Sequence, residues 1–191
     1  MHNENIGTLG FLGCGQMGQA ILSGLLDSKI CDPSSILVSA KSSAKETASR
    51  FGVSAVSAGE LLQRCDVIFL GIKPYQLHLT SAWVSEAKEK WRDRERPPLL
   101  LSMLAGTNFA QLRDQLGEEL SLVRIMPNLP AQVSLGVTLI CAEPNAPLAT
   151  DHLRWSAELL RPLGHVEPLN AEEEFHAATA ISGCGPAYLF N

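Results

Sequence analysis

The chain has 191 residues, of which 46% are hydrophobic, and its formal net charge is −5. This length and composition allow a sizeable core in one large domain, or in one domain and part of another. The acidic balance and the lack of a basic run argue against nucleic-acid or anionic-membrane partners. No apolar segment approaches the roughly eighteen residues that a membrane span needs.

The first predicted element is a buried strand over Leu9–Leu12, which runs into a glycine-rich turn and an amphipathic helix. The turn reads Gly13-Cys14-Gly15-Gln16-Met17-Gly18. Gly13 permits the tight turn, Gly15 lets the backbone approach a phosphate, and Gly18 lets the helix pack close to the strand. The helix start then offers free N–H groups to an anion. Strand, turn and helix together predict a site for a dinucleotide pyrophosphate; the alternative is an ordinary glycine-rich turn.

The second predicted strand, Ile36–Ser39, ends without the carboxylate that would hold the ribose 2′-hydroxyl of NAD. Lys41, together with Ser39, Ser42 or Ser43, would instead attract a 2′-phosphate, so NADPH is favoured over NADH. The alternative is that Ser43 and Glu46 only form a capping box that opens a helix over residues 43–51, with Lys41 as a solvated loop charge. Both interpretations can hold at once.

The rest of the chain alternates between predicted strands and predicted helices. We expect strands over residues 53–56, 66–72, 99–103, 122–126, 136–140 and 164–169. We expect helices over residues 57–62, 77–91, 108–116 and 147–160, the first and third of them opened by capping boxes. The apolar run 66–72 is typical of a strand buried on both faces of a parallel sheet. This order predicts an α/β fold with a Rossmann-like, doubly wound, mostly parallel sheet and a ligand at the carboxyl ends of its strands.

The loops after three of these strands carry small or apolar residues. They read Ile72-Lys73-Pro74, Met103-Leu104-Ala105-Gly106 and Met126-Pro127-Asn128. Such loops suit a flat nicotinamide ring that needs a dry pocket, and proline fixes the backbone of a loop at little ordering cost. The alternative is that each proline merely ends its strand.

The cysteines indicate the redox compartment. There are five, at positions 14, 31, 65, 141 and 184, and they form no C-x-x-C motif. An odd count without that motif favours reduced thiols in the cytoplasm, and the first five residues lack the features of a signal peptide. Cys14 at a helix start is either a reactive thiol of lowered pKa or, more commonly, a small side chain that fits. The histidines show no metal spacing, so we expect no metal site.

Five segments resemble pyrroline-5-carboxylate reductase, in order from about residue 6 to the last residue. They are the glycine turn, residues 66–74, Leu104-Ala105-Gly106, the segment 124–130 around Met126-Pro127-Asn128, and residues 179–188. The last two motifs are far more specific than the glycine turn. The resemblance implies a dinucleotide-binding domain, here residues 1–170, followed by an all-helical dimerisation domain of which residues 171–191 form only the beginning. It also implies reduction of 1-pyrroline-5-carboxylate to L-proline with NAD(P)H, by a homo-oligomeric full-length enzyme.

The resemblance also assigns the cofactor contacts. Residues 13–18 would hold the pyrophosphate, and Ser39, Lys41 and Ser42 would lie near the adenosine ribose and its phosphate. Residues 72–74 and 103–106 would line the nicotinamide ribose and ring, and Asn128 would sit on the ring side of the cleft. The chain differs from the family at two positions, and each difference weakens one expected contact. Ala58 stands where the family often has Asn, and Cys184 stands where it has Ser.

The resemblance names no catalytic side chain in this chain. A protonated imine is already an electrophile and the cofactor carries the hydride, so little is asked of acids and bases. Because the groups that bind the substrate would lie beyond residue 191, we expect this chain to bind NADPH without turning over substrate. The alternatives are a non-catalytic NADP-binding module or shortened relative, and a different reductase acting on a β-hydroxyacid or a flavin-like carrier. The motifs at 126–128 and 182–188 argue against the last of these.

Overall fold

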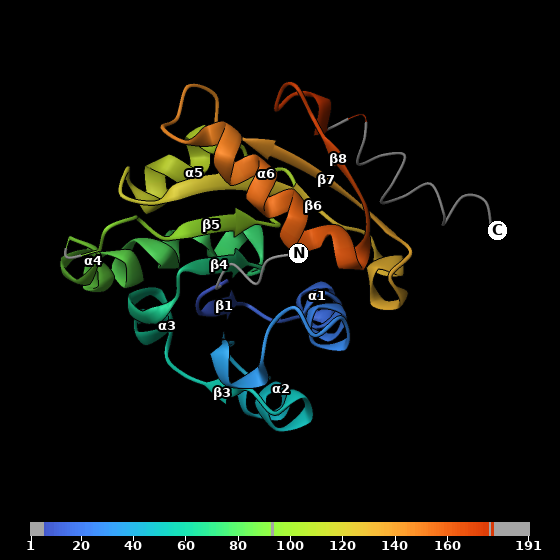
Figure 1. Ribbon diagram of the computed structural model, residues 1–191. Coiled ribbons are helices and arrows are strands. Elements are labelled where there is room, and N and C mark those ends of the chain that lie inside the picture. The colour runs from blue at the N-terminus through green and yellow to red at the C-terminus, as the bar shows by residue number, and fades with distance from the viewer. Residues whose placement is uncertain (1–5, 93, 176, 178–191) are drawn as a thin grey trace.

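One eight-stranded sheet organises the fold, with the strands in the order β3-β2-β1-β4-β5-β6-β7-β8 (Figure 1). The computed structural model describes residues 6–92, 94–175 and 177. The strands are β1 Leu9–Leu12, β2 Ile36–Ser39, β3 Ser54–Ala55, β4 Val67–Leu70, β5 Leu99–Ser102, β6 Ser121–Met126, β7 Gly136–Ala142 and β8 Gly164–Pro168. The helices are α1 Gln16–Asp27, α2 Ala44–Phe51, α3 Ala58–Arg64, α4 Thr80–Trp91, α5 Phe109–Leu116 and α6 Ala149–Leu160.

The sheet is parallel from β3 across to β6. Strand β7 runs antiparallel to β6, and β8 runs parallel to β7. The reversal follows from the connection: β6 and β7 are joined only by a short 3₁₀ helix, η3 Leu129–Val133, and a parallel pairing would require a longer crossover. The predicted Rossmann-like, doubly wound and mostly parallel sheet is confirmed.

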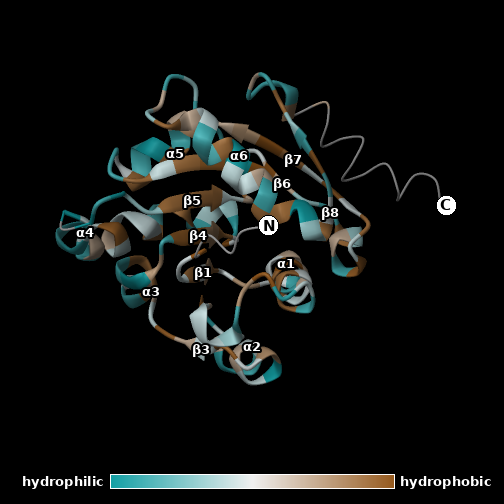
Figure 2. Ribbon diagram, viewed as in Figure 1, coloured by the Kyte–Doolittle hydropathy of each residue, from teal (hydrophilic) through white to brown (hydrophobic). Residues whose placement is uncertain are grey.

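Two apolar layers cover the two faces of the sheet. Helices α1, α2 and α6 pack on one face, and α3, α4 and α5 on the other (Figure 1). The central strands β4 and β5 are brown in Figure 2, as expected where both faces are buried. Phe11 of β1 and Phe69 of β4 stack with their ring centroids 4.7 Å apart, which joins the two central strands within one layer.

The helix starts test the predicted capping boxes. Asn108 and Gln111 form the complete box at α5: the Gln111 amide donates to Asn108 Oδ1 over 2.8 Å, and the Asn108 amide donates to Gln111 Oε1 over 2.9 Å. At α3, Ser57 Oγ accepts from the Glu60 amide, while the Glu60 carboxylate pairs with Arg64 instead of closing the box. The box predicted at Ser43 is wrong.

Backbone geometry explains that error. Ser43 has φ −105° and ψ 0°, outside the extended region that an N-cap side chain needs to reach back, and its hydroxyl makes no capping bond to the described residues. The α-helix predicted over residues 77–91 begins only at Thr80, as α4, and ends at Trp91 as predicted. The residues before it, Pro74–Leu79, form a 3₁₀ helix, η2, that leads into α4. None of the helices within the described ranges is long and apolar enough to cross a membrane.

Candidate dinucleotide site at the carboxyl ends of the strands

Gly13 lies where the strand order reverses. Strand β1 pairs with β2 on one side and β4 on the other, and ligands of doubly wound sheets bind at this kind of switch point. Gly13 has φ +84°, a conformation that glycine adopts without strain. A Cβ there would come within 2.6 Å of the Gly71 carbonyl carbon. The Gly13 amide also donates to the Ser39 carbonyl over 2.7 Å, so the turn is fixed between the ends of β2 and β4.

The start of α1 is open. Gly15 is its N-cap and is exposed, and a Cβ built on it would meet no atom of the described residues within 4 Å. The first amides of the helix have no intrahelical partner, and its first turn holds no acidic residue. Gly18 is packed more closely, since its Cβ would come 3.3 Å from the Cys14 sulfur. This is the backbone arrangement that a pyrophosphate site requires.

The Cys14 thiol is not activated by the helix start. Its side chain is 1% exposed. Burial raises its pKa from 9.0 to about 12, because a thiolate would be desolvated there. Cys14 is therefore the small, protonated side chain of the commoner interpretation, and the reactive-thiol alternative is wrong.

Lys41 and Ser42 are exposed in the turn that follows β2, whereas Ser39 is buried at the tip of the strand. A second cation, which was not predicted, approaches the first turn of α1. Arg50 Nη1 donates to Gln19 Oε1 over 3.1 Å, and Gln19 Nε2 donates to the Cys14 carbonyl over 3.3 Å. The two residues are 31 positions apart, and they come from α1 and α2, which cover the same face of the sheet.

The loops after β4 and β5 meet the glycine turn. A Cβ on Gly71 would come 2.7 Å from the Gly13 carbonyl oxygen and equally close to Met103 Cε, so the three strand ends are in contact. Ile72 and Met103 are half-buried and Leu104 is buried. The exposed members of these loops are Lys73, Pro74, Ala105 and Gly106. The apolar side chains predicted for the nicotinamide therefore lie beside the predicted pyrophosphate site.

Asn128 has a structural partner. Its Oδ1 accepts a hydrogen bond from the Val137 amide over 2.9 Å, which ties the end of β6 to the start of β7. Its side chain is half-buried. A contact between Asn128 and a nicotinamide ring remains a prediction.

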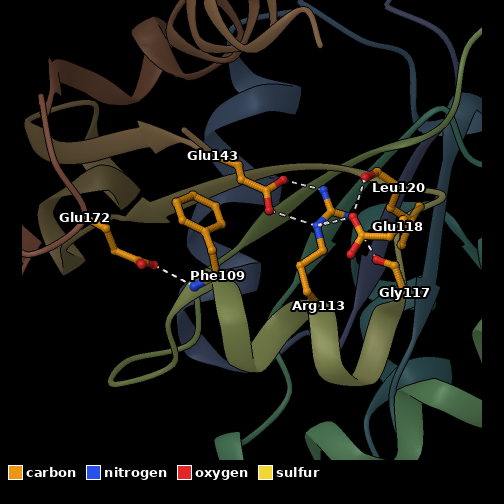
Figure 3. A network of polar contacts seen from close by, with 7 residues as sticks. All are labelled: Phe109, Arg113, Gly117, Glu118, Leu120, Glu143 and Glu172. Atoms are coloured by element: carbon orange, nitrogen blue, oxygen red, sulfur yellow. Dashed lines mark hydrogen bonds and ion pairs between the residues drawn. The ribbon is translucent and has the colours of Figure 1, made fainter. Parts of the chain in front are cut away.

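A charged cluster borders the loop after β5. Arg124 lies in β6 and is 5% exposed, and its Nη1 is 2.7 Å from Glu172 Oε1. The same carboxylate oxygen accepts from the Phe109 amide over 2.7 Å (Figure 3). A cavity of about 140 Å³ is lined by Gly106, Asn108, Arg124, Glu172 and Glu173. The signal for this cluster was an arginine inside an apolar strand, but its partner 48 residues away could not be inferred.

A larger groove of about 610 Å³ is open to solvent and lies between η2 and α5. Its walls include Tyr75, His78 and Gln111, on the outer side of the loop that begins with Lys73. Within residues 6–92, 94–175 and 177, no three His, Cys, Asp or Glu side chains are grouped so as to hold a metal ion.

Comparisons with known proteins agree with this architecture. Residues 8–106 match the family described as NADP oxidoreductase coenzyme F420-dependent. Over 185 residues the chain is 35% identical to pyrroline-5-carboxylate reductase of Escherichia coli K12, covering 95% of this chain and 65% of that protein. The enzyme of the same name from Staphylococcus saprophyticus is 32% identical over 186 residues, with the same coverage. The chain thus spans about two thirds of the length of these relatives.

Solved structures give the same result. Plasmodium falciparum pyrroline carboxylate reductase, crystallised with NADP bound, superposes with a TM-score of 0.79 at 29% identity, over 98% of this chain and 66% of that one. The Coxiella burnetii pyrroline-5-carboxylate reductase gives 0.82 at 26% identity, over 97% and 67%. A 3-hydroxyisobutyrate dehydrogenase from Mycobacterium tuberculosis, at 15% identity and 0.67, shares the fold over 96% of this chain and 60% of that one. The predicted resemblance is therefore confirmed, and the chain belongs to the NADP oxidoreductase coenzyme F420-dependent family.

Proposed function

We propose that this chain binds NADPH and provides the cofactor half of an enzyme that reduces 1-pyrroline-5-carboxylate to L-proline in proline biosynthesis. The observation that carries the proposal is the open start of α1 at the switch point of the sheet, with Gly15 facing free space. The substrate is inferred from the relatives named pyrroline-5-carboxylate reductase, and the cofactor from the relative crystallised with NADP bound.

The residues around the switch point fit the three parts of NADPH. The pyrophosphate would lie on residues 13–18, where a Cβ at Gly15 would occupy its place. The 2′-phosphate would lie near Ser39, Lys41 and Ser42, a strand end that carries no acid. The nicotinamide would lie along residues 72–74 and 103–106 and near Asn128. Preference for NADPH over NADH follows from the second of these assignments.

The chain would contribute orientation rather than acid–base chemistry. When bound, NADPH supplies the hydride, and the protonated imine accepts it. Ile72, Met103 and Leu104 offer an apolar wall that keeps water from the reacting atoms. The fixed turn at Gly13 and the strand ends around it hold the cofactor in one place, and such positioning is worth up to about 7–11 kcal/mol of a barrier.

The substrate site and the assembly belong to the same proposal. Because the relatives are longer than this chain, we assign the groups that hold the substrate carboxylate, and the homo-oligomeric interface, to the part of the enzyme that follows the aligned region. We propose that the dinucleotide-binding domain ends at residue 170 and that the helical domain begins at residue 171. A cytoplasmic location is proposed because Cys14, Cys31, Cys65 and Cys141 are all free thiols.

The test compares two proteins. The first is the 191-residue chain, which we expect to bind NADPH but not to oxidise it measurably when 1-pyrroline-5-carboxylate is added. The second is a chimera that joins to this chain the segment of the Escherichia coli relative that follows the aligned region, and we expect it to turn over. A chimera that binds NADPH yet reduces no imine would favour the alternative of a non-catalytic NADP-binding module. Turnover by the chain alone would place the substrate site within residues 1–191.

A further inference from the structure

Helix α5 is held by one ion pair near each end, and the two pairs lie at opposite edges of the sheet. Figure 3 shows the pair of Arg113 with Glu143, and Glu172 of the other pair. Arg113 lies in the second turn of α5. It donates to both carboxylate oxygens of Glu143 and to the carbonyls of Gly117 and Leu120, where β6 is about to begin. Arg124 and Glu172 form the other pair, beside the first residue of the helix. Only this second pair lies next to the loop predicted to contact the nicotinamide.

Glu172 acts on the backbone of that loop. Its Oε1 accepts from the Phe109 amide, the first N–H of α5, over 2.7 Å. The reciprocal bonds between Asn108 and Gln111 satisfy two further amides of the same turn. A carboxylate at a helix start is also favoured by the helix dipole. The carboxyl end of the 103–108 loop is therefore fixed by a side chain from a segment 63 residues further along the chain.

Arg124 fixes the position of Glu172. It follows the sheet register beside Ser102, the last residue of β5, and its guanidinium is held from both sides. One side is the Glu172 carboxylate, and the other is the ring of Phe175, 4.4 Å from the guanidinium carbon to the ring centroid. Its side chain is only 6% exposed, so this charge is costly unless Glu172 stays in place.

The other end of the loop is equally fixed. The Met103 amide donates to the Leu70 carbonyl over 3.0 Å, and the Leu104 amide lies 3.4 Å from Ser102 Oγ. Between these anchors and Phe109 lie Ala105 and Gly106, which are exposed, with Gly106 at φ +68°. The loop is thus a short span between two anchors, and its exposed middle borders the 140 Å³ cavity beside Arg124.

We propose that Arg124 is a positioning residue: through Glu172 it sets the conformation of the 103–108 loop, and so the affinity for the nicotinamide end of NADPH. This inference rests on the proposed function, because it takes the loop as the nicotinamide contact. It assigns neither residue a contact with the cofactor. The effect should therefore be confined to one end of the dinucleotide.

The test uses two ligands on the full 191-residue chain: NADPH, and 2′-phospho-ADP-ribose, which has the same adenosine and pyrophosphate but no nicotinamide ring. The double variant Arg124→Met, Glu172→Gln removes both charges together, so that no unpaired charge is buried. We expect it to bind NADPH roughly two- to tenfold more weakly, the scale of one hydrogen bond, and to bind 2′-phospho-ADP-ribose as the unchanged chain does. Glu172→Ala, which also removes the acceptor for the Phe109 amide, should show the same pattern more strongly.

The matched control is Arg113→Met, Glu143→Gln, which removes the pair at the other edge of the sheet. It should alter thermal stability without altering the affinity for either ligand. If Glu172→Ala fails to fold, the charge-neutral double variant decides the matter. If that variant binds both ligands more weakly by the same factor, the pair has a merely structural role. If its NADPH affinity is unchanged, the pair has no role in binding. Either result overturns the inference. An unchanged chain that bound neither ligand would instead overturn the proposed function, and this inference with it.

Discussion

Gly13 and Gly71 lie so close that neither can carry a side chain. A Cβ on Gly13 would come 2.6 Å from the Gly71 carbonyl carbon, and a Cβ on Gly71 would come 2.7 Å from the Gly13 carbonyl oxygen. The partner in each case is backbone, which cannot swing aside as a flexible side chain can. This contact joins the turns after β1 and β4 at the point where the strand order reverses. Gly13 is therefore needed for the fold, whereas Gly15, whose Cβ would meet no atom of the described residues within 4 Å, is free to serve a ligand. The sequence motif alone cannot distinguish these two roles.

Gly13→Ala should destabilise the fold, whereas Gly15→Val should remove dinucleotide binding. The alanine faces both the backbone contact and φ +84°, a conformation that costs a residue with a Cβ roughly 1–2 kcal/mol before any clash. Gly15 has φ −76°, and its Cβ would enter open space, so valine is tolerated by the fold but occupies the predicted place of the pyrophosphate. Thermal unfolding and an NADPH titration of each variant measure the two effects. A Gly15→Val chain with unchanged NADPH affinity would place the phosphate elsewhere.

Lys41→Asp should weaken NADPH binding and leave NADH binding nearly unchanged. The side chain is exposed at the end of β2, and the substitution replaces attraction for a 2′-phosphate by repulsion. The expected loss is on the order of 1–3 kcal/mol for NADPH. Calorimetric titration of both cofactors measures it.

Lys29→Asp is the control for overall charge, because Lys29 is exposed beyond the other end of α1. It should change neither affinity by more than a small amount. Equal losses of NADPH affinity in the two variants would mean that net charge, and not a phosphate pocket, sets the preference.

The buried thiols should make the chain less stable at alkaline pH. Burial raises the pKa of Cys14 and Cys65 from 9.0 to about 12, and that of Cys31 to about 11. Above pH 9 the unfolded chain releases these protons while the native chain retains them. Their contribution to stability is therefore complete below pH 9 and is lost as the pH rises towards 12.

Other groups titrate in the same pH range, so the unchanged chain has to be compared with a variant that lacks one of the thiols. The free energy of unfolding from urea titrations should fall less steeply with pH above 9 in Cys14→Ala than in the unchanged chain. Native Cys14 should also react slowly with a thiol reagent at neutral pH. Identical pH slopes, together with rapid modification of Cys14, would contradict the burial argument.

Glu143→Ala should be strongly destabilising, and Glu60→Ala should not. In the first pair the side chains of Arg113 and Glu143 are 14% and 17% exposed, and removing the carboxylate leaves a largely buried guanidinium without its main partner. Loss of one partner from such a pair costs about 3 kcal/mol. The Arg64–Glu60 pair is 54% and 46% exposed, and pairs of that kind contribute about 0–1 kcal/mol. Urea unfolding measures both; similar losses would mean that the Arg113 network carries no special stability.

The parallel part of the fold was predictable because its signal is local. The apolar runs predicted as strands over residues 66–72 and 99–103 are short and bounded by turns, and they contain the buried strands Val67–Leu70 and Leu99–Ser102. The complete capping box at Asn108 is likewise contained within four residues. The predicted box at Ser43 had the right residues but the wrong backbone, since the φ and ψ of the N-cap residue itself decide whether its hydroxyl can reach the helix amides.

The parts of the candidate site that could be predicted are those made of contiguous segments. The glycine turn and the strand ends are contiguous segments, and topology brings them together at one edge of the sheet. Arg50 with Gln19, and Arg124 with Glu172, were missed because their partners lie 31 and 48 residues away. Nothing in a single sequence states which of many acids a buried arginine will meet. Of the expected beginning of the helical domain, residues 171–191, all but 171–175 and 177 lies outside the described residues.

The most direct test of the account is an amide NMR titration of the labelled 191-residue chain with NADPH. The proposed site predicts saturable shifts concentrated at residues 13–18, around Lys41 and in the loops 72–74 and 103–106, with NADH producing the same pattern at higher concentration except around Lys41. Shifts confined to another region, such as the groove lined by Tyr75 and His78, or no shifts at all, would contradict it.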